Sequence, residues 1–386
     1  MSETLVAIFS GGGTGGHLYP ALALAGRLAE RRSDVLPFFL GAERGVEARV
    51  LPERGLPHLL LPVRGLDRER WLANVGVVAA LLNALGRVAS LFQRLRPALV
   101  VVTGGYAGGP AGLLAVLTRT PLVLQEQNAV PGVTTRALAP FAAQVHVAFP
   151  EAVDALPARS RSRTRVTGNP VEPPAPRPRE EAAAFFDLRP DRLVILVVGG
   201  SQGSLALNRA VLDAVTHIVR GDLPARPEVQ LLWSTGPTHL AELQTTLAEL
   251  GGPDWVRAVG YIDRMELALS VADLAVSRAG AMATSEFLAW GVPAVLVPLP
   301  TAAADHQTRN ARTLEEAGAA VHLAEEEATP ERLWELVTEL TANRDLRTTM
   351  ASAARRRGRP RAALEIAEAL EGLLPPARPR GTGGAR

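Results

Sequence analysis

A histidine that follows a run of glycines near the amino terminus has the type and spacing to move a proton beside an anion. Residues 11–16 read Gly-Gly-Gly-Thr-Gly-Gly, and His17 comes directly after them. Glycine lets backbone amides approach a ligand closely, and a helix that starts at such a turn directs its positive end towards an anion. Imidazole has an ordinary pKa of about 6.5, and a helix N-terminus favours its neutral form. We therefore expect His17 to act as a general base beside a phosphate-binding turn.

Two other interpretations of this cluster stay open from its spacing alone. Gly11, Gly13 and Gly16 satisfy the dinucleotide-binding pattern, and Glu43 follows the next expected strand, so a nicotinamide-dependent oxidoreductase is a rival. The cluster is also compatible with a tight strand-to-helix turn and an incidental histidine. The dinucleotide pattern requires neither the threonine nor the histidine found here, which favours a different phosphate-bearing ligand.

Polar or glycine-rich residues also follow several other apolar runs. The segment 199–203, Gly-Gly-Ser-Gln-Gly, repeats the plan of the first cluster. Small residues begin the helix expected from residue 281, where a bulky anion fits, and Glu286 one turn later can accept hydrogen bonds from the vicinal hydroxyls of a ribose. Gln307 and Asn310 are neutral donors and acceptors suited to sugar hydroxyls. Each segment is equally compatible with an ordinary turn, cap or solvated loop.

The elements that position these residues alternate between strands and helices in both halves of the chain. Strands are expected at 5–9, 35–40, 99–102, 122–125 and 145–148, then at 193–198, 229–233, 258–262, 274–277, 294–297 and 320–323. Helical patterns lie between them, and this alternation predicts an α/β protein with parallel sheets covered on both faces. Because such folds bind ligands at the carboxyl ends of their strands, the polar segments are expected at that edge of each sheet.

The chain is expected to divide into two such domains. Repeated prolines at 172–180 exclude regular structure and predict a linker. An N-terminal domain at 1–171 precedes it, and a C-terminal domain at 181–374 follows, with a last helix able to pack back on the first domain. The tail at 375–386 is rich in Pro, Gly and Arg and is expected to be disordered.

Composition excludes several classes of chemistry. The 386 residues include neither cysteine nor lysine, which rules out disulfides, thiolate nucleophiles and Schiff bases. A formal net charge of +2 gives no support for a nucleic-acid partner. No group of residues has metal-ligand spacing, so no metal and no cofactor are expected. The amino terminus lacks a basic start and no apolar run reaches transmembrane length, which together predict a cytoplasmic protein.

Taken together, the motifs resemble the MurG family of bacterial peptidoglycan glycosyltransferases. The segments that carry the resemblance are 12–17, 105–110, 126–128, 168–171, 199–203, 281–286 and 305–310. The resemblance covers nearly the whole chain and implies a GT-B fold, in which two doubly wound, Rossmann-like domains face a cleft. It implies inverting, metal-independent transfer of N-acetylglucosamine from UDP-N-acetylglucosamine to the 4-hydroxyl of lipid I, giving lipid II. A different UDP-sugar enzyme, such as a glycolipid synthase or a 2-epimerase, is the alternative within this fold.

The resemblance also implies roles for individual residues, with His17 as the catalytic base. Residues implied to bind UDP-N-acetylglucosamine are Thr14, Gly15, Gly16, Asn128, Ser201, Ile262, Ala281, Met282, Ala283, Thr284, Ser285, Glu286 and Gln307, with Gly13, Tyr106, Glu126, Gln202 and Asn310 as further candidates. Of these, Asn128 and Gln307 would contact the sugar, and the backbone of Ile262 would contact uracil. Many relatives have an arginine where Glu172 stands, so that role is left unassigned.

One segment combines apolar and basic residues in a way that bears on membrane contact. Apolar residues recur at Trp71, Val75, Val78, Leu82, Leu85 and Phe92, flanked by Arg64, Arg68, Arg70, Arg87, Arg94 and Arg96. The pattern alone is typical of a core-facing helix with a solvated flank. With the resemblance, we expect peripheral contact with an anionic membrane surface at the cytoplasmic face of the cell membrane. Other cell-wall or division proteins are conceivable partners.

Overall fold

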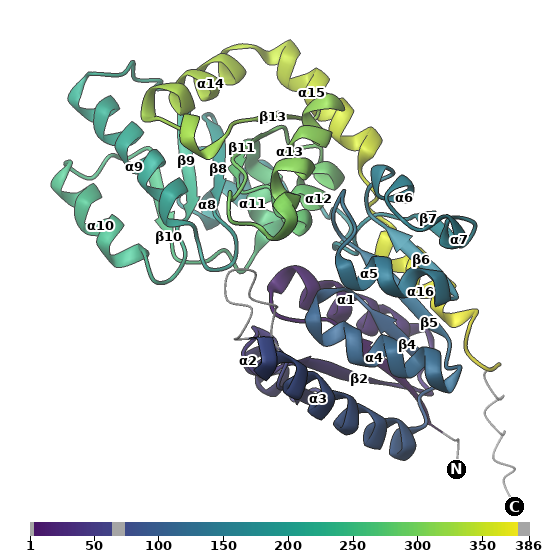
Figure 1. The fold of residues 1–386 in the computed structure, drawn as a ribbon. Coiled ribbons are helices and arrows are strands. Elements are labelled where there is room, and N and C mark those ends of the chain that lie inside the picture. The colour runs from purple at the N-terminus through teal and green to yellow at the C-terminus, as the bar shows by residue number, and fades with distance from the viewer. Residues whose placement is uncertain (1–3, 64–73, 377–386) are drawn as a thin grey trace, which may run out of the picture. The chain divides into compact units, whose positions relative to one another are not determined.

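The computed structural model describes residues 4–63 and 74–376 of the chain. The chain forms two compact units, one made of residues 1–171 with 361–386 and the other of residues 172–360. Each unit is built on a parallel sheet with helices packed around it (Figure 1). The predicted α/β class with two doubly wound sheets is confirmed.

Sheet A lies in the first unit, and in the described residues it has seven parallel strands in the order β3-β2-β1-β4-β5-β6-β7. These are β1 (Leu5–Ser10), β2 (Val35–Ala42), β3 (His58–Leu61), β4 (Leu99–Val102), β5 (Leu122–Glu126), β6 (Gln144–Val147) and β7 (Thr164–Val166). Strand β1 pairs with β2 on one side and with β4 on the other, so the winding reverses between β1 and β4. The loops after β1 and β4 meet at this switch point, where open α/β folds bind ligands.

Helices cover both faces of sheet A. They are α1 (Gly15–Arg31), α2 (Glu47–Glu53), α3 (Asn74–Leu95), α4 (Gly105–Thr118), α5 (Val133–Leu138), η2 (Ala139–Phe141), α6 (Glu151–Asp154), α7 (Ala158–Arg161) and α16 (Ala362–Glu371). Helix α16 returns from the end of the chain to pack against α1. Ile366 and Leu370 join the core there, and Arg31 pairs with Glu371 at 2.9 Å.

Sheet B lies in the second unit, and its described part has six parallel strands in the order β10-β9-β8-β11-β12-β13. These are β8 (Leu193–Val198), β9 (Val229–Ser234), β10 (Val256–Val259), β11 (Ala272–Ser277), β12 (Ala294–Leu296) and β13 (Ala320–His322). Strand β8 pairs with β9 and with β11, so this sheet repeats the switch point of sheet A. The loops after β8 and β11 therefore meet as those after β1 and β4 do.

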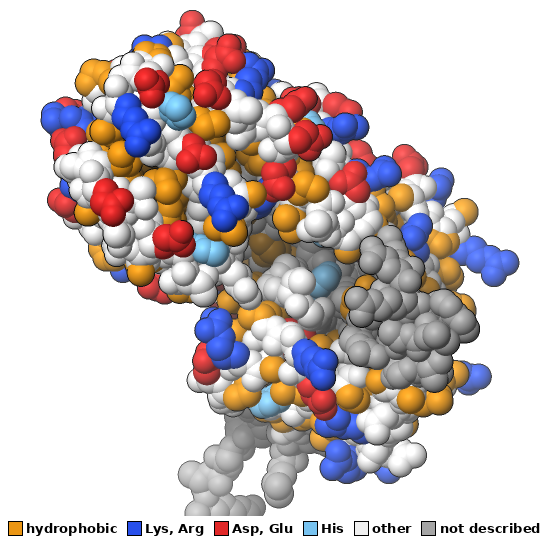
Figure 2. Space-filling model, turned by 60° about the vertical axis from the view of Figure 1, so that its left-hand side comes forward, with side chains coloured by type: hydrophobic (Ala, Val, Ile, Leu, Met, Phe, Trp, Pro, Cys, Tyr) orange, Lys and Arg blue, Asp and Glu red, His pale blue; other side chains and the backbone are white. Residues whose placement is uncertain are grey.

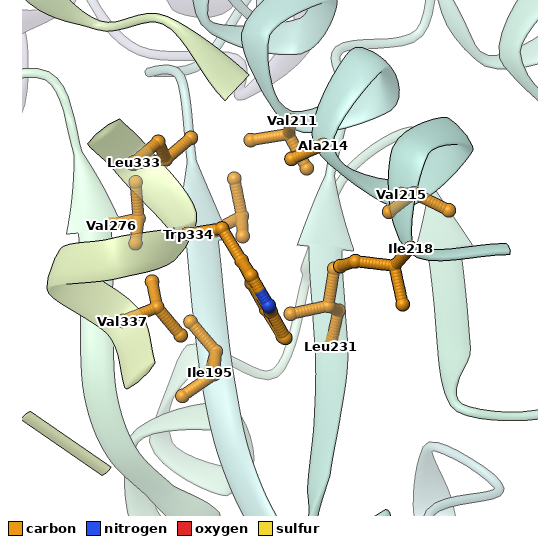
Figure 3. A pocket seen from close by; sticks show the side chains of 11 residues that line it. Ile195, Val211, Ala214, Val215, Ile218, Leu231, Val276, Leu333, Trp334 and Val337 are labelled. Carbon is orange, nitrogen blue, oxygen red and sulfur yellow. The ribbon is translucent and has the colours of Figure 1, made fainter. Parts of the chain in front are cut away.

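The helices of the second unit pack an apolar core onto sheet B. They are α8 (Arg179–Phe185), α9 (Leu205–Arg220), α10 (Leu240–Glu249), α11 (Met265–Val271), α12 (Ala281–Trp290), η3 (Ala303–Asp305), α13 (His306–Glu316), η4 (Glu325–Glu327), α14 (Pro330–Ala342) and α15 (Arg344–Arg357). Between α9, α14 and the sheet, Trp334 and its aliphatic neighbours line a wholly apolar cavity of about 20 Å³ (Figure 3). Its lining is core, so we assign it no ligand.

The strands that differ from expectation are short. The sequence pattern does not predict β3 and β7, which have four and three residues and form the two edges of sheet A. They are only four and three residues long and contain His58 and Arg165, so their signal is weak. The strand expected at 258–262 is β10, which ends at Val259. Ile262 therefore lies in the loop beyond the strand.

The segment expected to meet a membrane falls partly on residues 64–73, outside the described residues. Within α3, Leu82 is 64% exposed, whereas Phe92 is 5% exposed and packs in the core. The apolar pattern thus divides between surface and core, so only part of the segment can meet a membrane. In the described ranges, no helix combines the length and hydropathy needed to cross a bilayer. On the face shown in Figure 2, acidic and basic side chains are interspersed, in line with the net charge of +2.

Candidate functional site

The first glycine loop connects β1 to α1, and its glycines face two ways. A Cβ at Gly11 would lie 2.0 Å from Thr103 Oγ1, and a Cβ at Gly12 would lie 2.0 Å from Glu47 Oε1. These two positions therefore exclude any side chain because neighbouring groups fill the space. Gly13 has a φ of +98° and faces open space, and it is exposed together with Thr14. Only the outer part of the loop can meet a ligand.

His17 lies in the first turn of α1, at the switch point of sheet A. Its Nδ1 is 3.2 Å from Thr14 Oγ1, and its backbone oxygen accepts a 2.8 Å hydrogen bond from Thr103 Oγ1. Gly104, with a φ of +97°, lies against the imidazole, since a Cβ there would be 3.1 Å from Nε2. When Nδ1–H donates to Thr14, Nε2 is the ring nitrogen with the lone pair that a general base uses.

Glu126 lies at the end of β5 and shapes the loop that carries Asn128. The buried carboxylate accepts hydrogen bonds from the Asn128 amide at 3.2 Å, the Gly132 amide at 3.0 Å and Thr135 Oγ1 at 2.7 Å. Its oxygens are thus engaged within the first unit, and its contribution is to hold the position of Asn128. Tyr106, at the start of α4, is 55% exposed.

A buried amide network behind this loop is not evident from the sequence. Gln125 Nε2 donates to Asn169 Oδ1 at 3.0 Å, and Asn169 Nδ2 donates to the Gln127 carbonyl at 3.1 Å. Gln127 Nε2 in turn donates to the Thr103 carbonyl at 2.8 Å. The Gly-Asn-Pro-Val motif therefore ties together the loops that follow β4, β5 and β7. Gln127 and Asn169 belong to the motifs at 126–128 and 168–171, whereas Gln125 and Thr103 lie outside the motifs.

The second glycine loop connects β8 to α9. Ser201 and Gln202 are exposed at its tip. Gly203 has a φ of +77°, and a Cβ there would lie 2.0 Å from the Thr235 carbonyl oxygen, so the loop packs closely on the end of β9. Ser204 caps α9 by accepting from the Leu207 amide. A glycine-rich turn at the start of a helix suits an anion.

Arg278 links this loop to two others, a role that the sequence does not reveal. Its side chain is nearly buried, and Nε donates to Ser204 Oγ at 2.9 Å. Nη1 donates to the carbonyls of Val297 and Pro298 at 3.1 and 3.0 Å, and Nη2 pairs with Glu325. One guanidinium therefore fixes the loop after β8, the end of β12 and η4 relative to one another.

The start of α12 is arranged for an anion. Gly280 is its N-cap, and among the described residues no side chain caps it and no acid occupies its first turn. Amides in the first turn of a helix have no carbonyl acceptor within that helix. Thr284 is buried and donates its hydroxyl proton back to the Gly280 carbonyl at 3.0 Å.

Glu286 lies farther along α12, where burial raises the pKa of its carboxyl to about 7. Desolvation disfavours the charged form, so the group changes charge near neutral pH. Ser285, next to it, is half-buried. A perturbed carboxyl near the open end of a helix is a candidate for ligand recognition.

The remaining candidates of the second unit have defined partners. Gln307 Oε1 accepts from the Leu299 amide at 3.0 Å, which leaves Nε2 as the group able to reach a sugar. Asn310 is fully buried, and its Nδ2 donates to the Ala279 carbonyl at 3.2 Å, so it supports the segment before α12. Ile262 is 3% exposed, which restricts it to contacts through its backbone.

Two further expectations concern charge. Glu172 is exposed, and Arg165 and Arg177 are exposed as well, so none of them is assigned a ligand contact. Within the described ranges, no three His, Asp or Glu side chains are grouped closely enough to hold a metal ion.

Comparison with known proteins gives the chain its family. Residues 7–147 match the glycosyltransferase family 28 N-terminal domain, and residues 194–366 match the glycosyltransferase family 28 C-terminal domain. The UDP-N-acetylglucosamine–N-acetylmuramyl-(pentapeptide) pyrophosphoryl-undecaprenol N-acetylglucosamine transferase of Moorella thermoacetica is 40% identical over 94% of this chain and 97% of its own length. The protein of the same name from Salinibacter ruber is 41% identical over 92% of this chain and 94% of its own length.

A solved structure supports the same assignment. The crystal structure of Acinetobacter baumannii MurG is 30% identical in sequence, covers 96% of this chain and 99% of its own, and superposes with a TM-score of 0.76. These matches confirm the resemblance that the motifs indicate and disfavour the nicotinamide-dependent rival. The chain therefore belongs to the MurG family of UDP-sugar glycosyltransferases, with the GT-B fold and the paired domains of glycosyltransferase family 28.

Proposed function

We propose that this protein transfers N-acetylglucosamine from UDP-N-acetylglucosamine to the 4-hydroxyl of lipid I, giving lipid II. The observation that carries the proposal is the His17–Thr14 pair at the switch point of sheet A, in a chain related to such transferases over almost its whole length. A base placed there suits an alcohol acceptor. The glycine turn and the helix starts at the switch point of sheet B suit the diphosphate of the donor.

The reaction is a displacement at the anomeric carbon of the donor sugar. The acceptor oxygen forms a bond to that carbon from the face opposite UDP, and the bond from carbon to the diphosphate oxygen breaks. UDP leaves with the electron pair, and His17 Nε2 takes the proton of the acceptor hydroxyl. In this step Nδ1–H donates to Thr14 Oγ1, and Nε2 has the lone pair that accepts the proton. Attack from the opposite face inverts the configuration of the sugar.

The leaving group needs stabilisation as negative charge grows on it. The amides of Ser201 and of the first turn of α12 provide preorganised donors for the diphosphate. Glu286 accepts from the ribose hydroxyls, and the Ile262 backbone meets the uracil. Asn128 and the Nε2 of Gln307 contact the sugar. Thr14, Gly15 and Gly16 lie near the phosphates, and no metal enters the proposed chemistry.

We also place the protein peripherally at the cytoplasmic face of the cell membrane. Exposed apolar side chains lie on two neighbouring helices of the first unit: Leu81 and Leu82 on α3, and Leu113 and Leu117 on α4. Arg94 and Arg119 are exposed at the ends of the same helices. Leucines beside arginines can lie on an anionic bilayer.

Liposome flotation tests this placement. Leu82→Glu should weaken binding to anionic vesicles without changing the melting temperature, because the side chain is 64% exposed. Val219→Glu, at an exposed apolar position on α9 of the second unit, is the matched control. Equal vesicle binding by Leu82→Glu and wild type would show that α3 is not part of the membrane contact.

A transfer assay with radiolabelled UDP-N-acetylglucosamine and a lipid I analogue tests the main proposal. We expect labelled sugar to appear in the lipid product, with the configuration of its anomeric carbon inverted. Label found in a hexosamine whose configuration at carbon 2 is inverted, with none in the lipid, would instead indicate a 2-epimerase. Failure to bind UDP, with binding of NAD, would overturn the proposal in favour of the oxidoreductase.

A further inference from the structure

A buried carboxylate lies directly beneath the first glycine loop. Glu47, the first residue of α2, is fully buried. Its Oε1 accepts hydrogen bonds from the Gly13 amide at 2.7 Å and from the Ala42 amide at 2.8 Å. Its Oε2 is also buried and makes no hydrogen bond with the part of the chain that the structure describes. The two amides therefore provide all of the hydrogen bonding that this carboxylate has here.

Three glycines leave room for the side chain of Glu47, because a Cβ at any of them would overlap it. A Cβ at Gly12 would lie 2.0 Å from Glu47 Oε1, one at Gly41 would lie 2.3 Å from its Cγ, and one at Gly45 would lie 2.3 Å from Oε1. A buried carboxylate with few partners is costly, and an apolar side chain would fill the same space without that cost. Packing alone therefore does not explain why a carboxylate is found here.

The hydrogen bond from the Gly13 amide to Glu47 fixes the direction in which the loop runs from the core to the surface. Gly13 has a φ of +98°, and its amide points inward to Glu47 while the residue itself is exposed. The chain then turns outward at Thr14, the N-cap of α1, whose hydroxyl pairs with His17 and does not cap the helix. Among the described residues no side chain caps the first turn of α1, and the loop is held from below by Glu47.

We propose that Glu47 is a positioning residue for sugar transfer: its carboxylate holds Gly13 so that Thr14 and His17 present a fixed geometry to the acceptor. This inference rests on the proposed function and deepens it. It also gives a reason for the glycine at position 12. The sequence suggests that Gly12 approaches a ligand, whereas in the structure a Cβ there would overlap the Glu47 carboxylate.

The test combines acceptor kinetics with hydrogen exchange. Glu47→Ala removes both amide contacts, and Glu47→Asp keeps the charge but withdraws it from Gly13. In both variants we expect kcat/KM for the lipid I analogue to fall about 10- to 100-fold, because small misplacements of a reacting group have large effects. Affinity for UDP should stay within about twofold of wild type, since the proposed nucleotide contacts lie mainly in the second unit. Amide exchange in a peptide covering 11–17 should become faster.

Two further variants sharpen the result. Glu47→Gln should recover part of the acceptor kcat/KM, because its carbonyl oxygen can still accept from both amides. Glu53→Gln is the matched control: Glu53 lies on the same helix and is exposed, so its substitution should leave kinetics and exchange unchanged.

The proposal is overturned if a folded Glu47→Ala or Glu47→Asp keeps wild-type acceptor kinetics and wild-type exchange at 11–17. It is also overturned if activity falls only in proportion to the folded fraction, with the acceptor KM and the exchange unchanged. Should Glu47→Ala not fold, Glu47→Asp decides by the same two readouts. A wild-type protein that transfers no sugar would instead defeat the proposed function, while the exchange result would still report on the loop.

Discussion

The turn after β1 and the turn after β8 lie at equivalent switch points of two parallel sheets, yet different side chains support them. In the first turn, the inward-facing amide of Gly13 donates a hydrogen bond to the carboxylate of Glu47. The second is supported by Arg278, which donates a hydrogen bond to the hydroxyl of Ser204. Two turns with similar glycine patterns are thus built with opposite charges beneath them.

This difference matches the two halves of a transfer reaction. The donor side must accept negative charge as the diphosphate leaves, so free amides and a cationic support suit it. The acceptor side holds a neutral alcohol and a base, and a carboxylate beneath that loop does not oppose a histidine that becomes positively charged. Glycine spacing alone does not distinguish these roles, because the supporting residues come from distant segments.

The largest expected effect is on the first turn. His17→Ala should lower turnover about 10²- to 10⁴-fold, the usual contribution of a general base. The dissociation constant for UDP should change little, because the proposed nucleotide contacts lie mainly in the second unit. Initial rates and equilibrium titration measure the two effects, with His58→Gln on β3 as control. Full turnover by the His17→Ala variant would show that His17 is not the general base.

At the second turn, we expect a substitution to change UDP affinity instead. Arg278→Lys keeps the charge but loses the planar fork that contacts Ser204, Val297 and Pro298. We expect UDP affinity to fall about tenfold, roughly 1.4 kcal/mol. Calorimetric titration measures it, and Arg332→Lys, in an exposed pair with Glu335, is the control. Unchanged affinity would mean that Arg278 does not shape the nucleotide site.

A pH series examines the second unit further. The pKa of Glu286 is raised to about 7, so its carboxylate forms mainly above neutral pH. Ribose hydroxyls donate to the carboxylate, so UDP affinity should rise up to about tenfold from pH 6 to pH 8. The phosphate of UDP also titrates, with a pKa of about 6. The part of the pH dependence that is absent from Glu286→Gln is therefore the part that Glu286 contributes. The same slope in both proteins would exclude Glu286 from ribose binding.

The two units should also differ in how pH affects their stability. Burial lowers the pKa of His146 in the first unit to about 4, so its imidazole is neutral when folded and protonates more readily when unfolded. Stability from this group is present above pH 6.5 and is lost as pH falls towards 4, by about 3 kcal/mol. Glu286 acts in the opposite sense, because its raised pKa makes the second unit more stable as pH falls from 7 towards 4.5.

Native-state hydrogen exchange can follow each unit separately in this pH series. His146→Gln should remove the acid sensitivity of sheet A while leaving sheet B as it was. An acid sensitivity that is equal in the two units, or unaffected by the substitution, would contradict this assignment.

The sequence predicts the central strands and the polar loops because these carry strong local signals. Strands β4 and β8 have the predicted bounds, since continuous Val and Leu runs mark buried parallel strands. Strand β7 has no such run. The family motifs include His17, but its contact with Thr14 appears only in the folded chain.

Residues that support the loops from below are harder to predict. Glu47 is 34 positions from Gly13, and nothing in its local sequence marks it as buried. Arg278 stands next to a recognised motif, but its partners lie up to 74 positions away. Asn310, expected to meet a sugar, is buried against Ala279, because tertiary packing decides where an amide points.

Amide hydrogen exchange with and without UDP tests the division of roles most directly. The account predicts slower exchange at 199–204 and 280–286 when UDP binds, with a smaller change at 11–17. Protection confined to 11–17, or no protection anywhere at saturating UDP, would contradict the assignment of nucleotide binding to the second unit.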